Sequence, residues 1–191
     1  MELGLEGKVG IITGNSRGIG KAISEALRKE GVIAPDISRT TGYNLTKQLY
    51  KLCKDYESCD ILINNIGGGG RWGADPLTFV EWDDVMFKNS TIMRELTLQY
   101  LPGMMNRQWG RIITISSTYG KEAGGKPWFT MAKASQIAFM KEMSKQGYEG
   151  ITFNTVSPGR IDVTEYNKEL SISQPSPMLI DSLEGDKLKY G

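Results

Sequence analysis

Three glycines near the start of the chain have the spacing of a phosphate-binding turn. The segment Thr13–Gly20 reads TGNSRGIG and lies between a β-rich apolar run and an amphipathic helical pattern. Gly14 permits a tight turn, Gly18 lets the main chain approach a pyrophosphate, and Gly20 lets helix and strand pack closely. The N-terminus of the following helix offers unpaired N–H groups and partial positive charge to phosphate oxygens. The spacing therefore predicts a dinucleotide site; an ordinary strand-to-helix turn is the alternative.

Histidine is absent from the 191 residues, which limits the acid–base chemistry of the chain. Ser-His-Asp hydrolysis and histidine-ligated zinc are excluded, so a proton transfer must use Lys, Tyr, Asp, Glu or Cys. Cys53 and Cys59 lack the spacing of a metal or redox motif, so we expect free thiols and no metal site.

The overall composition is ordinary for a globular protein, with 39% apolar and 24% charged residues. A net charge of +1 gives no support to a nucleic-acid or membrane partner. No secretory leader is visible, and no apolar run approaches the roughly 20 residues that span a bilayer. We therefore expect a cytoplasmic protein.

The elements that must position the turn alternate between short apolar runs and longer helical patterns. This alternation predicts a parallel sheet wrapped by helices. The predicted strands are Val9–Thr13, Val32–Pro35, Ile61–Asn64, Arg111–Ser116 and Ile151–Val156. The predicted helices are Gly18–Lys29, Lys47–Asp55, Val80–Met105 and Phe129–Gln146. In the third helix, Asn89 interrupts an apolar stripe at mid-length.

The length favours a single domain over residues 1–191. Gly67–Gly70 follows a predicted strand, and four successive glycines indicate a flexible loop. After Gly159 the chain becomes polar and rich in helix-breaking residues, so we expect residues 165–191 to be a loosely ordered flap or end region.

Several motifs occur in the order of one enzyme family. Asn64–Gly67 reads NNIG, Asn89 lies within a long helix, Ser116-Ser117 ends a strand, Phe129-x-x-x-Lys133 follows, and Pro158-Gly159 comes after the last predicted strand. With the G-x-x-x-G-x-G turn, these motifs resemble the classical short-chain dehydrogenase/reductase family over about residues 5–165. The resemblance implies a three-layer α/β/α Rossmann-type doubly wound sheet, here of six parallel strands and shortened at its C-terminal end.

The resemblance further implies an NAD(P)-dependent oxidoreductase that interconverts a carbonyl and an alcohol. A small-molecule carbonyl or alcohol is then the expected substrate. The residues at cofactor-contact positions of the family are Gly14, Asn15, Ser16, Arg17, Gly18, Ile19, Gly20, Arg39, Asn44, Leu45, Asn65, Gly67, Lys133, Pro158, Gly159 and Ile161.

Two arginines and one aspartate bear on the choice between NADP and NAD. Arg17 lies in the phosphate turn, and Arg39 aligns with the cofactor-selecting position of the family; two guanidiniums would suit the 2′-phosphate of NADP. Asp36 is the counter-evidence, because an acidic residue after the second strand binds the ribose hydroxyls of NAD. We predict NADP, with NAD as the alternative. The segment before Asn44-Leu45-Thr46, which resembles the family's adenine-side motif, is abridged.

The catalytic tyrosine of the family is replaced in this chain. The family uses Tyr-x-x-x-Lys, in which the phenol exchanges a proton with the substrate oxygen, whereas this chain carries Phe129. By resemblance, Ser117 orients the substrate, Lys133 binds the nicotinamide ribose, and Asn89 supports a relay water. A positioned general acid contributes ~10²–10⁴-fold in rate, or roughly 3–5 kcal/mol of barrier. Carbonyl reduction by the usual route is therefore expected to be impaired.

Three explanations of Phe129 stay open. The chain is a pseudoenzyme that kept a cofactor site, or another residue donates the proton, or the substrate needs no acid. Tyr119, two residues after Ser117, is the best substitute acid, although a loop aromatic that packs over the cleft is the plainer interpretation. Val163, with Thr164 beside it, occupies a position where the family often has a nicotinamide-binding threonine.

The expected assembly is a homodimer or tetramer. The helices that contain Asn89 and Lys133 would form the contact, because we expect spare apolar residues such as Met140 and Met143 on their faces. Nothing in residues 165–191 resembles the closing strand of the family, so a second familiar contact is in doubt.

Overall fold

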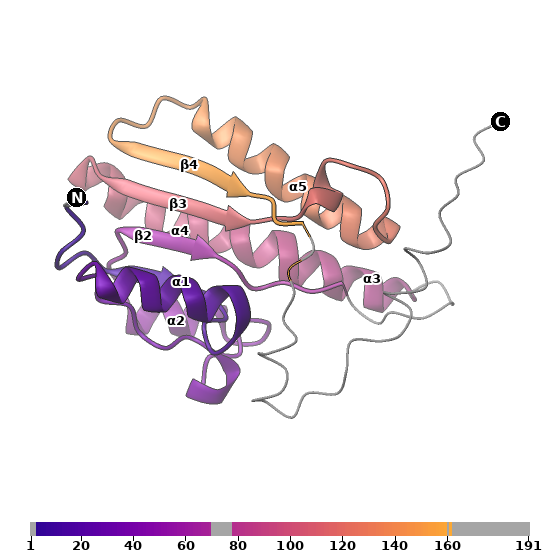
Figure 1. The fold of residues 1–191 in the computed structure, drawn as a ribbon, viewed down its shortest axis with the longest axis horizontal. Coiled ribbons are helices and arrows are strands. Elements are labelled where there is room, and N and C mark those ends of the chain that lie inside the picture. The colour runs from indigo at the N-terminus through magenta and orange to yellow at the C-terminus, as the bar shows by residue number, and fades with distance from the viewer. Residues whose placement is uncertain (1–2, 70–77, 160, 162–191) are drawn as a thin grey trace. The chain divides into compact units, whose positions relative to one another are not determined.

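The structure is a computed structural model that describes residues 3–69, 78–159 and 161. Its sheet contains four parallel strands in the order β1 (Gly10–Ile12), β2 (Ile61–Asn64), β3 (Gly110–Ile115) and β4 (Ile151–Val156) (Figure 1). Isoleucines lie side by side on neighbouring strands, as Ile12 of β1 does with Ile63 of β2. Residues of β1 and β2 are buried throughout, as expected of a parallel sheet covered on both faces.

The prediction of six strands is wrong for the residues that the structure describes. Val32–Pro35 does not form a strand and contributes only an isolated bridge between Ile33 and Val9. Proline at position 35 has no N–H to continue the ladder, and the Ala34 carbonyl accepts hydrogen bonds from Arg28 instead. The other four predicted strands are present within one or two residues of their expected bounds.

The helices include α1 (Gly18–Lys29), α2 (Leu49–Asp55), α3 (Phe79–Met86), α4 (Ile92–Arg107) and α5 (Pro127–Ser144). Three short turns are η1 (Arg39–Thr41), η2 (Phe87–Thr91) and η3 (Thr118–Gly120). The long helix predicted over Val80–Met105 is thus divided, because η2 is a π-helical turn between α3 and α4. Its centre is Asn89, the residue that interrupts the apolar stripe in the sequence. π-Turns of this kind are frequent at functional sites.

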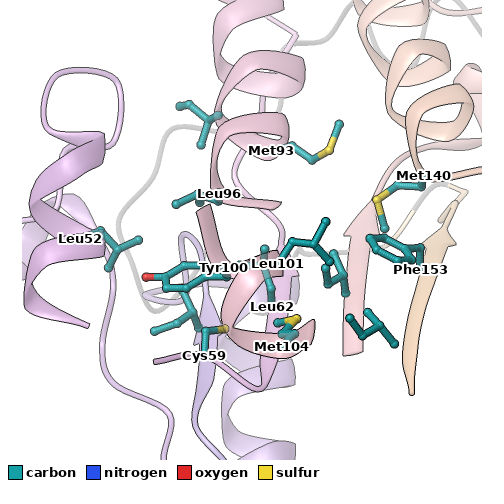
Figure 2. Packing of buried hydrophobic residues seen from close by; sticks show 14 of the residues in the cluster. Leu52, Cys59, Leu62, Met93, Leu96, Tyr100, Leu101, Met104, Met140 and Phe153 are labelled. Carbon is teal, nitrogen blue, oxygen red and sulfur yellow. The ribbon is translucent and has the colours of Figure 1, made fainter. Parts of the chain in front are cut away.

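Helices cover both faces of the sheet. Ile11, Leu62 and Ile112 point to the face packed by α2, α4 and α5, and Figure 2 shows Leu96, Tyr100 and Met104 of α4 in this cluster. Alternate residues of the same strands, such as Ile12 and Ile63, point to the face packed by α1. The apolar stripe of α1, which meets this face, consists of Ile19, Ile23 and Leu27. This is the three-layer α/β/α Rossmann-type arrangement.

Two side chains expected on a free helix surface lie against the core instead. Met140 is fully buried and Met143 packs partly on the same cluster, because both lie on the face of α5 that meets the sheet. Met140 is therefore not available for a dimer contact, whereas Met143 keeps a partly exposed side chain. Cys53 and Cys59 are free thiols, as predicted.

All the described elements belong to one compact unit, residues 1–160. Gly70, Val163, Thr164 and the predicted end region 165–191 lie outside the described residues. Over the part that is described, no helix is both long and apolar enough to cross a membrane, and no three His, Cys, Asp or Glu side chains gather as a metal site would require.

Candidate active site

The N-terminus of α1 is open toward the turn that precedes it. Gly14 and Gly18 adopt positive φ angles of 69° and 56°, which glycine accepts without strain. Arg17 at the N-cap position makes no side-chain capping bond, and the first turn of α1 contains no acidic residue. Ser16 and Arg17 are exposed. Uncapped N–H groups at a helix start without a competing carboxylate fit the phosphates of a dinucleotide.

Gly20 lies where α1 passes closest to the ends of β1 and β2. A Cβ atom at this position would approach the Gly14 carbonyl oxygen to 2.6 Å and the Asn65 Nδ2 atom to 2.5 Å. We therefore expect Gly20→Ala to displace the turn, to lower the free energy of unfolding by about 1–3 kcal/mol and to weaken dinucleotide binding. Urea denaturation and calorimetric titration measure the two effects.

A control for Gly20→Ala is Ala22→Ser, which adds one atom at an exposed position of the same helix. Equal stability and equal cofactor affinity of Gly20→Ala and the wild type would show that helix and turn are not in tight contact.

Thr13 and Asn65 connect the ends of β1 and β2 beneath the turn. The Thr13 hydroxyl accepts hydrogen bonds from the main-chain N–H groups of Asn65 and Ile66 at 2.9 and 3.0 Å. The Asn65 amide donates to the Thr13 carbonyl at 2.9 Å. Asn65, predicted to contact the cofactor, thus supports the turn from below.

Asn15 joins the phosphate turn to the segment after residue 34. Its Nδ2 atom donates to the Pro35 carbonyl at 2.8 Å, and its Oδ1 atom accepts from the Ile37 N–H at 2.7 Å. The Ile37 carbonyl in turn accepts from the N–H groups of Gly14 and Asn15. With its side chain only 3% exposed, Asn15 orders the protein rather than facing a ligand. The sequence placed it in the turn but gave no sign of this partner.

The residues proposed to select the cofactor differ in their surroundings. Arg17 and Arg39 are exposed, and Arg39 begins the short turn η1. The Asp36 carboxylate is not free, because Arg28 of α1 donates to it at 2.6 Å. Arg28 is absent from the set of residues that the sequence motifs identified, since no motif of the turn includes it.

The adenine-side motif is divided between core and surface. Leu45 is buried in the cluster shared by α2, α4 and α5. The side-chain oxygen of Asn44 accepts from the Thr46 hydroxyl at 2.7 Å, and its carbonyl accepts from two following N–H groups. Asn44 therefore shapes the start of α2, and Leu45 does not present its side chain to solvent.

Lys133 and Phe129 lie one turn apart on α5 and face the carboxyl end of β3. The Lys133 ammonium donates to the Ile115 carbonyl at 3.0 Å and lies 5.6 Å from the centroid of the Phe129 ring. Phe129 also packs beside the cluster of Val85, Trp128 and Ala132. The ring takes part in an apolar contact at the position where the related motif has an acid.

Burial lowers the pKa of Lys133 to about 8 from its usual 10.5. The side chain is 5% exposed, and only one carbonyl hydrogen bond is formed by its ammonium among the described residues. Removal of the charged group from water is the cause, because desolvation favours the neutral amine. Lys133 is thus mostly charged at pH 7 and loses its proton in mildly alkaline solution.

The two serines at the end of β3 have different environments. The Ser116 hydroxyl is buried and donates to the Lys133 carbonyl at 2.9 Å, which fixes α5 to the strand end. Ser117 is half-buried, and its hydroxyl accepts from the Tyr119 N–H at 3.3 Å. Ser117 is therefore the serine that can reach a ligand.

Tyr119 packs on the loop that leads to α5. A Cβ atom at Gly125 or Gly124 would lie 3.0 or 3.2 Å from atoms of the Tyr119 side chain. In the described part of the chain, no hydrogen bond joins its phenol to Ser117 or Lys133. Tyr119 is half-buried, and its role as a substitute acid stays a prediction.

Asn89 is fully buried and holds the loop after β2. Its Nδ2 atom donates to the carbonyls of Gly68 and Val85, both at 2.8 Å, and its Oδ1 atom accepts from the Gly68 N–H at 3.3 Å. The Asn89 carbonyl accepts from the Nε2 atom of Gln136 at 2.7 Å. A relay water at this carbonyl would have to share it with Gln136, a residue that the sequence motifs did not identify.

Gln136 could have been found by its place in the sequence. It follows Lys133 by three residues on the face of α5 that also carries Ala132 and Met140, where a polar side chain needs a partner. Its side chain is fully buried, so the bond to Asn89 fixes η2 against α5.

The glycine loop is held more firmly than its composition predicts. The Gly69 carbonyl accepts from the indole N–H of Trp128 at 2.8 Å. A Cβ atom at Gly67 would lie 2.5 Å from the Asn89 Oδ1 atom and 3.4 Å from the Lys133 Nζ atom. Gly67 therefore brings an exposed main chain close to the lysine, as a contact with a ribose requires.

The loop after β4 reaches the same end of the sheet. The Pro158 carbonyl accepts from the Thr118 N–H at 3.0 Å, next to Ser117, and Gly159 is exposed. Ile161 is exposed as well. The structure thus brings Ser117, Lys133, Asn89 and Gly67 together at the carboxyl ends of β2, β3 and β4, where open α/β sheets bind ligands.

Comparison with known proteins identifies the family of this chain. The family model described as short chain dehydrogenase matches residues 33–175. The 3-oxoacyl-[acyl-carrier-protein] reductase FabG of Vibrio cholerae is 34% identical over 202 residues, which cover 93% of this chain and 82% of that protein. The FabG reductase of Escherichia coli is 33% identical with the same coverage.

Solved structures show the same fold. An oxidoreductase of the short chain dehydrogenase/reductase family from Burkholderia thailandensis superposes with a TM-score of 0.72 at 24% identity, over 86% of this chain and 74% of that one. A short-chain dehydrogenase from Streptomyces avermitilis gives a TM-score of 0.70 at 23% identity, over 84% and 69% of the two chains.

Proposed function

The chain belongs to the short-chain dehydrogenase family, and we propose that this member prefers NADP and turns over slowly because Phe129 replaces the catalytic tyrosine. Members of the family are NAD(P)-dependent oxidoreductases that act on CH–OH and carbonyl groups. The observation that carries the proposal is the Phe129 ring beside the Lys133 ammonium, 5.6 Å away, at the end of β3. A phenyl ring has no proton to give, whereas the surrounding groups that hold substrate and cofactor are present.

The roles of the residues follow from their surroundings. The bound cofactor supplies the hydride chemistry. The open start of α1 and the exposed Arg17 hold its phosphates, and Arg39 is placed to meet a 2′-phosphate. Lys133, which is mostly charged at pH 7, binds the nicotinamide ribose. The Ser117 hydroxyl orients the carbonyl oxygen of the substrate, while Asn89 and Gln136 fix the loop that contains Gly67.

A second function is a cofactor-binding sensor or partner subunit without turnover. Two observations favour it. Phe129 packs with Trp128 and Ala132 as an apolar side chain would, and a relay water at the Asn89 carbonyl would have to share it with Gln136. This alternative keeps the dinucleotide site and removes the reaction.

The substrate class and setting are also part of the proposal. The FabG relatives are named as reductases of 3-oxoacyl groups on acyl carrier protein, so a 3-oxoacyl thioester is the first substrate to assay. We further propose a cytoplasmic location and assembly into a dimer or tetramer. Any helix contact in that assembly must use exposed apolar residues such as Leu98, Met105 and Met131 rather than Met140.

The test compares the wild type with Ser117→Ala in NADPH-dependent reduction of a 3-oxoacyl thioester. We expect a slow wild-type reaction that falls ~10-fold or more in the variant, because the hydroxyl that orients the substrate is lost. Tyr119→Phe, measured alongside, should retain the wild-type rate. A rate abolished by Tyr119→Phe would instead identify Tyr119 as the acid, and cofactor binding without reaction in every variant would favour the binding subunit.

A further inference from the structure

Asp36 is the acidic residue of this segment that could select NAD. It follows Gly14 by 22 residues, close to the spacing at which a carboxylate binds the ribose hydroxyls of NAD. The main chain on both sides of it is bonded to the phosphate turn, since Asn15 holds the Pro35 carbonyl at 2.8 Å and the Ile37 N–H at 2.7 Å. A free carboxylate here would bind a ribose diol and repel a 2′-phosphate.

The Asp36 carboxylate is instead paired with Arg28, a residue of the last turn of α1. Arg28 donates to its Oδ1 atom at 2.6 Å. Arg28 follows Gly18 by ten residues, so its Cα lies roughly 15 Å along the helix from the end that receives phosphates. The same guanidinium donates from Nε to the Ala34 carbonyl at 2.8 Å, which fixes its orientation.

From these contacts we propose that Arg28 is a specificity-determining residue: it neutralises Asp36 and turns that carboxylate away from the adenosine ribose, so that NADP is preferred. Arg28 acts as a positioning residue and does not contact the cofactor. The inference rests on the proposed function, because it concerns the cofactor site of that oxidoreductase.

The consequence for each cofactor has a definite sign. Without the guanidinium, no positive charge is paired with the Asp36 carboxylate, and its side chain is free to turn toward the ribose. It then repels the 2′-phosphate of NADP and accepts hydrogen bonds from the 2′-hydroxyl of NAD. The pair is partly exposed, with side chains 40% and 64% accessible, so the expected change is moderate.

The experiment is calorimetric titration of the full chain with NADPH and NADH. We expect Arg28→Gln to shift the ratio of the two dissociation constants toward NADH by about 3- to 10-fold. Adding Asp36→Asn in the double variant should abolish that shift, because the repelling charge is gone. Arg94→Gln is the matched control, since it removes an exposed arginine that pairs with Glu95 on α4.

The single variant Asp36→Asn gives an independent readout if Arg28→Gln folds poorly. We expect it to change the ratio less than about twofold, because Arg28 already neutralises Asp36 in the wild type. A large loss of NADH affinity in Asp36→Asn, or an unchanged ratio in Arg28→Gln, would overturn the role of Arg28. A wild type that binds both cofactors equally would overturn the NADP preference alone, because the shift between variants would still report on Arg28.

Discussion

Replacement of Phe129 by tyrosine is expected to raise the rate of NADPH-dependent carbonyl reduction by ~10²–10⁴-fold. The change adds a hydroxyl to a ring that lies 5.6 Å from the Lys133 ammonium, beside the end of β3, two residues before Ser117. A nearby cation lowers the pKa of a phenol and so improves it as a proton donor near neutral pH. Steady-state kinetics with a 3-oxoacyl thioester and saturating NADPH measure kcat in both proteins.

Phe79→Tyr is the control, because it adds the same hydroxyl at a position of α3 that is 81% exposed. It should leave kcat unchanged. If Phe129→Tyr binds NADPH as the wild type does and yet gains no turnover with any carbonyl, the proposed oxidoreductase is wrong and the cofactor-binding subunit is favoured.

Replacement of Lys133 by methionine is expected to stabilise the fold and to weaken cofactor binding. The folded protein holds this lysine with a pKa of about 8 against the usual 10.5, so its charge opposes folding below pH 8 by roughly 3 kcal/mol. Loss of the hydrogen bond to the Ile115 carbonyl costs the variant about 1 kcal/mol, which offsets part of the stabilisation gained when the buried charge is removed. We therefore expect Lys133→Met to unfold at pH 7 with a free energy about 1–3 kcal/mol higher than the wild type.

The sign of the pH dependence follows from proton binding. Between about pH 8 and 10.5 the folded chain has released the Lys133 proton, whereas the unfolded chain keeps it. The free energy of unfolding of the wild type therefore rises relative to that of Lys133→Met as the pH increases through this window. Urea denaturation at pH 7 and pH 10 measures the difference. A methionine variant less stable than the wild type at pH 7 would show that the buried charge does not oppose folding.

The functional cost of Lys133→Met is a separate measurement. Loss of a charged donor to a ribose hydroxyl is expected to weaken NADPH binding by ~10–100-fold, the equivalent of 1.5–3 kcal/mol. Unchanged affinity in a folded variant would remove Lys133 from the cofactor site.

The sequence predicts the helices and the central strands well where periodicity and flanking glycines agree. α1 has the expected bounds, and β2 and β4 match to the residue. The strand expected at Val32–Pro35 does not form. Pro35, which has no N–H for the ladder, was visible in the sequence, but the contact of Arg28 with the Ala34 carbonyl was not. The prediction of Met140 as a surface residue fails for a related reason, because the residue type does not show whether an apolar side chain on a helix faces the sheet or the solvent.

The site was predictable as a set of motifs but not as a network. Gly14 and Gly20 follow from the spacing of the glycine turn, whereas Ser117 and Lys133 follow from the resemblance to the family. The long-range bonds of Asn15 to Pro35 and of Gln136 to Asn89 join residues 20 and 47 positions apart. Such bonds depend on how the elements pack, and no local pattern of residue types encodes them.

The most direct test of this account is calorimetric titration of the wild-type protein with NADPH and NADH at pH 7. We predict saturable binding of NADPH that is tighter than that of NADH, because the open start of α1 and the exposed Arg17 and Arg39 are proposed to meet the phosphates while Arg28 holds Asp36. Binding of neither cofactor would contradict it, and would leave a protein that has the fold of the family without its dinucleotide site.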